Sequence, residues 1–310
     1  MTTDTWFDDL PVIGKLPPEE AAAKLREVGE DELADAIEAA QRKVTTASTT
    51  FGILEDLLPF LPRPWLYPAH VFGYSTPAMS DSALLPIQDA GKIVADSTLK
   101  NTLITITLDQ VHVAKYPGGG THYILFDFEA ETQVLNRAET LNFNAVHRIC
   151  EGNQVAIINQ PIFAPLNVGT EGVGFRYCTV NVKNEEDEKA LSFLESFPFQ
   201  SGIAAASIAQ PAIAPLTGLA IGLTKMIANR SKNFPLPPIN LGLDFSNIAN
   251  RARLAEGSYI VVQIPESMQL AWDWDVWVYD PSSGRVVNVD DRELIDLNYT
   301  VFRVSRYQGN

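Results

Sequence analysis

Alternation of apolar and polar residues dominates the chain after residue 99 and predicts β-strands. Two alternating runs, 103–113 and 122–131, flank the turn Pro117-Gly118-Gly119-Gly120. Side chains of a strand point alternately to its two faces, so two such runs around a glycine turn are typical of a β-hairpin. Similar runs occur at 141–149, 154–159, 174–182, 239–245, 258–264, 276–279, 285–289 and 299–307.

The number and spacing of these runs predict the fold class. About ten short strands without regular strand–helix alternation are typical of an antiparallel β-sandwich or jelly roll. A second hairpin is predicted at 276–289, because Asp280, Pro281 and Gly284 occupy positions that β-turns favour. The tripled glycine at 118–120 predicts backbone with positive φ, which glycine adopts without steric cost.

Helical periodicity appears before the strands. Apolar residues such as Leu25, Leu33 and Ile37 recur three and four positions apart within 17–43, and Pro17-Pro18-Glu19-Glu20 opens the segment. Proline and early carboxylates favour a helix N-terminus. We therefore predict a helical hairpin that packs on the main body or on a second copy of the chain.

A segment rich in proline and aromatic residues follows the predicted hairpin. A short helix is expected at 51–61, and prolines at 59, 62, 64 and 68 are interleaved with aromatic residues that include Trp65 and Tyr67. Proline holds the chain extended, which favours a strap that lies across a core. The alternative is a docking segment for a partner protein.

These patterns divide the chain into three parts. Residues 1–50 are predicted to be an arm and helical hairpin, 51–98 the strap, and 99–310 a β-sandwich with a helical insertion at 185–232. The insertion contains the longest stretch without a charge, at 196–224.

The uncharged stretch must be buried in protein, in a partner or in a membrane. A transmembrane helix needs about 20 consecutive apolar residues, whereas three prolines interrupt this stretch. Its second half predicts an amphipathic helix, whose apolar stripe consists of Leu216, Leu219, Leu223 and Ile227. We favour helices packed on the sheet; the alternatives are a cover for a neighbouring subunit and a membrane-inserting segment at 197–230.

Charge and cysteine content narrow the possible partners. The 310 residues carry a formal net charge of −15, which disfavours binding to nucleic acid and to anionic lipid. The two cysteines, Cys150 and Cys178, are predicted to be free thiols. The N-terminus lacks a signal-peptide pattern, so a cytoplasmic protein is expected.

Candidate chemistry is sparse. His112 and His122 flank the first predicted hairpin, where they could face each other and bind a metal or exchange a proton. Asp273, Asp275 and Asp280 form a cluster of oxygen ligands of the kind that calcium prefers, without a regular calcium-binding loop. We favour ordinary strand histidines and solvated loop acids, and we expect no cofactor.

Aromatic residues supply the remaining candidates for a site. Trp272, Trp274 and Trp277 lie close together in the sequence and, with Trp65 and Tyr67, form a candidate interaction surface. For the three later tryptophans, core packing is the alternative, and we favour it. The sequence shows no combination of nucleophile, base and orienting group that is typical of a catalytic site, so an enzyme is disfavoured.

The leading hypothesis is a non-enzymatic cytoplasmic β-sandwich protein that acts through protein–protein interaction, as a homo-oligomer or within a multi-protein system. The first alternative is a membrane-active protein that inserts 197–230. The second is a metal-dependent hydrolase or a calcium-dependent binding module.

Overall fold

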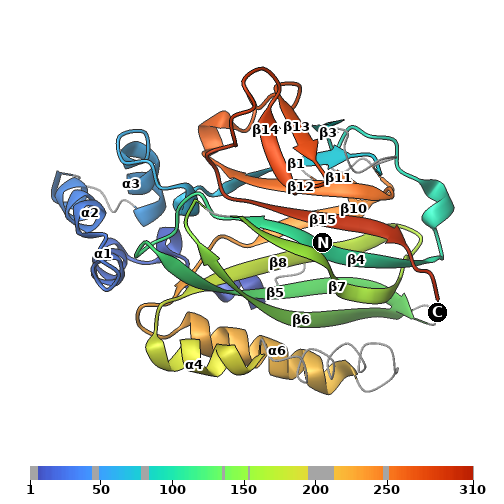
Figure 1. Cartoon of the computed structure of the whole chain (residues 1–310). Helices are drawn as coiled ribbons and strands as arrows, with labels where there is room; N and C mark the ends of the chain where they lie inside the picture. Colours follow the sequence, from blue (N-terminus) through green and yellow to red (C-terminus); the bar gives the residue numbers. More distant parts are fainter. Residues whose placement is uncertain are drawn as a thin grey trace.

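The computed structural model describes residues 6–43, 49–77, 84–134, 137–152, 154–194, 213–246 and 251–309. The protein is mainly β, and its neighbouring strands are antiparallel except in one short pair, which confirms the predicted fold class. Two six-stranded sheets face each other, and a smaller sheet and a layer of helices lie outside them (Figure 1).

The three sheets draw strands from distant parts of the sequence. The first large sheet has the order β3 (Gln88–Asp89), β1 (Ala69–Ser75), β12 (Gly257–Ile264), β15 (Tyr299–Arg306), β4 (Leu103–His112) and β7 (Gln154–Asn167). The second has the order β11 (Ala252–Arg253), β10 (Ile239–Asp244), β8 (Gly172–Val182), β5 (Thr121–Val134) and β6 (Arg137–Cys150), with β9 (Phe234–Pro235) beside β8. The small sheet has the order β14 (Arg285–Asn288), β13 (Trp277–Asp280) and β2 (Leu85–Pro86).

The main core lies between the two large sheets. Aromatic rings fill its middle, where Phe128, Phe175 and Phe302 are fully buried and in mutual contact. A second cluster of buried residues lies between the first sheet and the small sheet, and a third lies between the second sheet and the helices.

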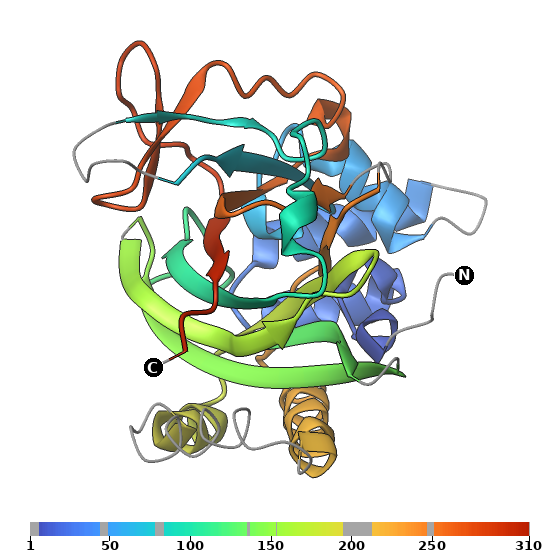
Figure 2. The same cartoon turned by 90° about the vertical axis from the view of Figure 1, so that its right-hand side faces the viewer.

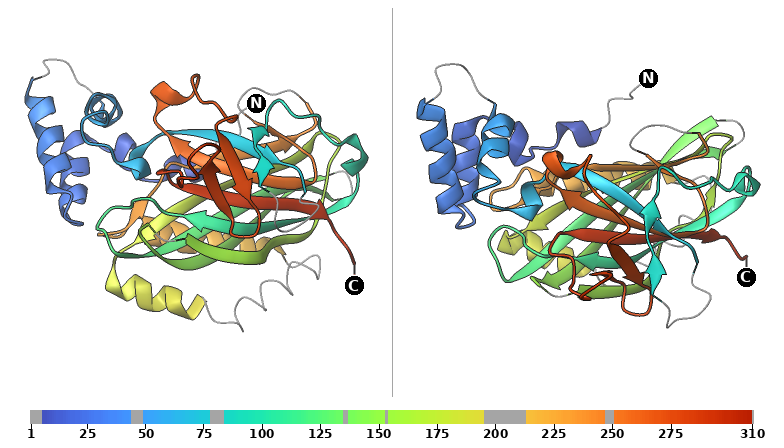
Figure 3. Two further views of the ribbon diagram at one scale, coloured as in Figure 1. Left: turned by 45° about the horizontal axis from the view of Figure 1, so that its top comes forward. Right: turned by 90° about the horizontal axis from the view of Figure 1, so that it is seen from above.

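Helices cover one end and one face of this body. The N-terminal helices are α1 (Pro18–Arg26), α2 (Asp31–Lys43) and α3 (Thr50–Leu57), and they gather at one end of the sandwich (Figure 3). Leu25, Leu33 and Ile37 are fully buried in the main core cluster, so the predicted helical hairpin packs on the body of its own chain. Helices α4 (Glu185–Leu194) and α6 (Ile213–Ala228) lie along the outer face of the second sheet (Figure 2).

Five short 3-10 helices complete the described elements: η1 (Trp6–Asp9), η2 (Ile13–Lys15), η3 (Pro64–Leu66), η4 (Ser97–Leu99) and η5 (Glu266–Met268). Within the described ranges, no helix has both the length and the apolar character that a bilayer crossing requires.

The first predicted hairpin is wrong, although its strands exist. Strand β4 pairs with β15 and β7, whereas β5 pairs with β6 and β8, so the connection at 113–120 crosses from one sheet to the other. Both strands find their partners far along the chain, and local alternation carries no information about such partners. The glycines behave as predicted, with φ values of 82°, 55° and 76° at Gly118, Gly119 and Gly120.

Sequence patterns predict the hairpin at 276–289 but miss the strands in the segment 51–98. The predicted hairpin at 276–289 is confirmed: β13 and β14 pair around a turn in which the Asp280 carboxylate accepts hydrogen bonds from Ser282 and Ser283. In contrast, no strand is predicted within 51–98, whereas β1 pairs with β12 along its full length. The strap therefore contributes β1 and β3 to the first large sheet and β2 to the small sheet.

Candidate functional site

The two histidines considered as an alternative metal site lie in different sheets. The ring of His112 stacks on Tyr299 with a centroid separation of 4.9 Å, on the side of the first sheet that faces the small sheet. His122 lies in the second sheet, and its Nδ1 is 3.1 Å from Oδ1 of Asn181. They cannot face each other across a hairpin, because β4 and β5 are not paired. Burial lowers the pKa of both imidazoles, that of His112 to about 4, so both are neutral at pH 7.

The predicted calcium ligands stabilise turns. Asp273 accepts a hydrogen bond of 2.9 Å from the amide of Asp275, and Asp280 lies at the opposite end of β13 in the hairpin turn. Within the described part of the chain, no three His, Cys, Asp or Glu residues lie close enough to hold a metal ion.

The predicted tryptophan cluster forms partly at the surface. Trp274 is buried, while Trp272 and Trp277 are partly buried and stack with their ring centroids 6.2 Å apart and their planes 11° apart. Leu270 is fully exposed, and further apolar side chains nearby in the loop and hairpin are also exposed. We define the loop surface as Met268, Leu270, Trp272, Val276, Trp277 and Val289.

Main-chain contacts join the two parts of the loop surface. The amide of Val289 donates to the carbonyl of Val276 at 2.9 Å, which brings the end of the hairpin beside the tryptophan loop. Exposed carboxylates neighbour these residues in the sequence, namely Glu266, Asp273, Asp275, Asp290, Asp291 and Glu293. Arg292 is an exposed cation among them. We call these carboxylates the acidic rim of the loop surface.

Trp65 and Tyr67 do not contribute to an exposed surface, contrary to the prediction. Both are buried, at 2% and 7% exposure. Their carbonyl oxygens accept hydrogen bonds from Nε2 of Gln263 at 3.1 and 2.8 Å. The short η3 helix turns the indole ring inward, where Trp65 contacts Phe234 edge to face.

One end of the main core is polar, a feature that the sequence analysis missed. Toward the end that α1–α3 cover, inward-facing residues change from apolar to polar on four strands. The series are Phe175, Tyr177, Thr179, Asn181 on β8; Tyr259, Val261, Gln263 on β12; Phe302, Thr300 on β15; and Phe126, Ile124, His122 on β5. We call the part of the core that holds the polar members of these series, namely His122, Thr179, Asn181, Gln263 and Thr300, the polar end. A signal was available within each strand, because the inward-facing series changes from apolar to polar along it. The change comes at different levels, since Thr179 lies opposite Phe126 and Thr300 lies opposite Val261.

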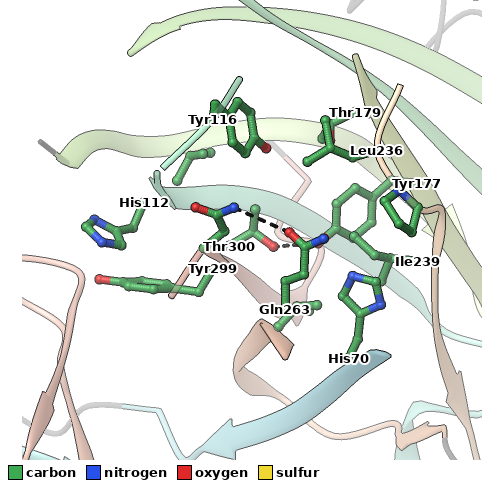
Figure 4. A pocket seen from close by; sticks show the side chains of 14 residues that line it. His70, His112, Tyr116, Tyr177, Thr179, Leu236, Ile239, Gln263, Tyr299 and Thr300 are labelled. Carbon is green, nitrogen blue, oxygen red and sulfur yellow. Dashed lines mark hydrogen bonds between the residues drawn. The ribbon is translucent and has the colours of Figure 1, made fainter. Parts of the chain in front are cut away.

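A cavity of about 30 Å³ lies within the polar end (Figure 4). The hydroxyls of Tyr177 and Thr300 hydrogen bond at 2.6 Å from opposite sheets, and Nδ2 of Asn298 donates to Oε1 of Gln263 at 3.4 Å. The described lining residues include no Asp, Glu, Lys or Arg. Burial lowers the pKa of His70, which also lines the cavity, to about 4. The cavity is therefore polar but uncharged at pH 7, and it has room for about one water molecule.

The described half of the uncharged stretch packs on the second sheet. Ile227 in α6 is fully buried and Leu223 is partly buried against the same cluster. The side chains of Leu216 and Leu219 lie outside the described residues. The hydroxyl of Thr224 donates to Asp127 of β5 at 2.7 Å, and burial raises the pKa of that carboxyl to about 6. Helix α6 is thus attached to the sheet by apolar and polar contacts.

Comparison of the chain with protein-family models, with curated proteins and with solved structures finds no match.

Proposed function

We propose that the protein is a non-catalytic module that binds a basic, partly apolar segment of a partner protein through the loop surface. The exposure of Leu270 carries this proposal. Large apolar side chains that cluster in water mark interaction sites, and here a fully exposed leucine lies two residues from the stacked pair Trp272 and Trp277. Aromatic residues at the centre of a patch are typical of residues that contribute most to binding.

The acidic rim favours a basic partner over a second copy of this chain. Asp273, Asp275, Asp290 and Asp291 would meet the same carboxylates across a symmetric contact, and like charges across an interface oppose association. Lysine or arginine residues beside an apolar anchor would complement the rim. A homo-oligomer stays an outcome of the test below.

Other observations bear on the compartment and on the membrane alternative. Cys150 is an exposed free thiol and Cys178 a buried one, which supports a reducing compartment such as the cytoplasm. Residues 213–228 form α6, which packs on the second sheet. The side chain of Ile227 is buried in that contact, so it is not exposed for insertion into a membrane.

A peptide-display experiment tests the proposal. Random 16-residue peptides are selected on the whole chain, and the affinities of recovered peptides are measured by fluorescence polarisation. We expect sequences that combine aromatic or aliphatic residues with lysine or arginine. Leu270→Asp should weaken them by about tenfold or more, because it places a charge at the centre of the contact.

The matched control is Val94→Asp, which changes another exposed apolar residue outside the loop surface. It should leave peptide affinity unchanged. Recovery of no basic peptide, or equal binding by the Leu270→Asp chain, would contradict the proposal. Sedimentation of both chains is the second measurement: a dimer that Leu270→Asp dissociates would show that a second copy occupies the surface instead.

A further inference from the structure

A groove of about 320 Å³ lies beside the polar end and has no role in the proposed function. Four separate segments enclose it: the N-terminal residues 8–15, helix α3, the η3 region and residues 235–238. The side chains that line it are mainly apolar, among them Val12, Ile13, Leu54, Leu58, Trp65 and Leu66. An open apolar cavity of this size falls within the range of small-molecule sites.

Pro237 lines both this groove and the cavity of the polar end, so the two cavities meet at this residue. The amide of Leu236 donates to the carbonyl of Thr179 at 2.9 Å, which attaches the segment before Pro237 to β8. An apolar chamber and a polar chamber are therefore adjacent at one proline.

The charges around the two chambers disfavour an anionic ligand. Asp8, Lys15 and Glu55 are the exposed charged residues that line the groove, and they sum to a net negative mouth on a chain with a net charge of −15. The polar chamber holds neutral donors and acceptors only among its described residues. A ligand that spans both chambers is thus best matched when it carries no charge.

The volume of the groove limits the size of the ligand. A cavity of about 150 Å³ accepts benzene, so a groove about twice as large suits a body of about two rings. We infer that the groove and the polar cavity form one site for an uncharged amphiphile, with its apolar body in the groove and a hydroxyl or carbonyl group directed past Pro237.

Three probes of matched size test this site by calorimetry on the whole chain: naphthalene, 2-naphthol and 2-naphthoate. We expect 2-naphthol to bind about three- to tenfold more tightly than naphthalene, since a neutral hydrogen bond contributes roughly that factor. The 2-naphthoate anion should bind most weakly. Equal affinity for naphthalene and 2-naphthol, or no binding of either, overturns the inference.

Variants locate the binding and separate it from the loop surface. Pro238→Trp should block the groove and abolish binding of both neutral probes, whereas Pro77→Trp, at an exposed proline elsewhere, should not. Thr179→Val should remove the preference for 2-naphthol and leave naphthalene binding unchanged. Leu270→Asp should change neither affinity.

Thermal unfolding of each variant shows whether it is folded. If Thr179→Val unfolds, Thr300→Val removes a hydroxyl from the same cavity and serves the same purpose. Binding that survives Pro238→Trp, or a preference for 2-naphthol that survives loss of the cavity hydroxyl, overturns the proposed site.

Discussion

The two ends of the core between the large sheets are built from the same strands but from different chemistry. At the aromatic end, which we define as Phe126, Phe128, Phe175 and Phe302, rings contact one another with centroids 5.2 to 6.3 Å apart. At the polar end, the equivalent inward positions hold Gln, Asn, Thr and His side chains. Tyr177 belongs to both ends, because its ring contacts the phenylalanines and its hydroxyl bonds to Thr300.

The two ends of the core make different contributions to the folded structure. Rings at the aromatic end bury apolar area and stabilise the pair of sheets. Polar side chains at the other end hold the connections between elements: Gln263 binds the carbonyls of Trp65 and Tyr67, and Asn181 binds the carbonyl of Pro117. The first kind of contact gives stability, and the second fixes where the connecting segments lie.

The largest effect is expected at the aromatic end. Phe302→Ala removes a fully buried ring that touches Phe128, Phe175 and Tyr177, so we expect the free energy of unfolding to fall by about 3–5 kcal/mol. Urea unfolding followed by circular dichroism measures it. Phe302→Leu should cost much less, because it keeps most of the volume. A loss below about 1 kcal/mol for Phe302→Ala would show that this end is not tightly packed.

A smaller effect is expected where the polar end holds a connection. Oδ1 of Asn298 accepts from the amides of Ala114 and Lys115, and Nδ2 donates to the carbonyl of Lys115. Asn298→Ala leaves these backbone groups without partners, so about 1–3 kcal/mol of stability should be lost in the same urea assay. Asn240→Ala, at an exposed position, is the control and should change stability by less than about 0.5 kcal/mol.

Acidification should lower the stability of the folded protein through His112. The pKa of His112 is about 4 in the folded protein, below its ordinary value of 6.5, so between these values the unfolded chain binds the extra proton. Stability that is present above pH 6.5 is therefore lost as pH falls toward 4, by at most about 1.4 kcal/mol per pH unit for this residue. His112→Phe should flatten the pH dependence of the urea midpoint between pH 7 and 5.

Asp127 lies on the outer face of the second sheet, and its contribution to stability should change with pH in the opposite direction. Its pKa is raised to about 6, above the ordinary value of 3.8, so the folded protein takes up this proton first and acid favours folding there. Asp127→Asn removes that contribution and should make the loss of stability between pH 6 and 4 steeper. A flatter profile in Asp127→Asn would contradict the assigned direction of its pKa.

Periodicity predicts those elements whose signal is local. The alternating run at 258–264 became β12, and the turn chemistry of Asp280 and Gly284 produced the hairpin of β13 and β14. Which strands pair cannot be read from alternation, since β4 and β5 are adjacent in sequence yet lie in opposite sheets. Strand β1 was missed because the surrounding prolines at 59–68 obscured its short pattern.

The sequence also predicts the candidate sites only in part. The tryptophans at 272–277 could be singled out by residue type, but whether each ring is exposed depends on how the loop folds against the small sheet. The polar end could not be found from one strand, because a lone Gln263 or Thr300 in a strand is unremarkable. Only the pairing of the strands shows that these residues lie at the same end of the core.

The smallest effect tests the boundary between the two ends at Tyr177. Tyr177→Phe keeps the ring contacts with Phe126 and Phe302 and removes only the hydroxyl bonded to Thr300, so about 1 kcal/mol should be lost. The adjacent cavity of about 30 Å³ admits a water molecule, which limits the cost of the unpaired Thr300 hydroxyl. The double variant with Thr300→Val should lose less than the sum of the single variants, because both partners of the bond are then absent. Urea unfolding of all four chains gives this coupling. Strict additivity would mean that the bond does not join the two sheets, and that the aromatic end alone holds them together at this level.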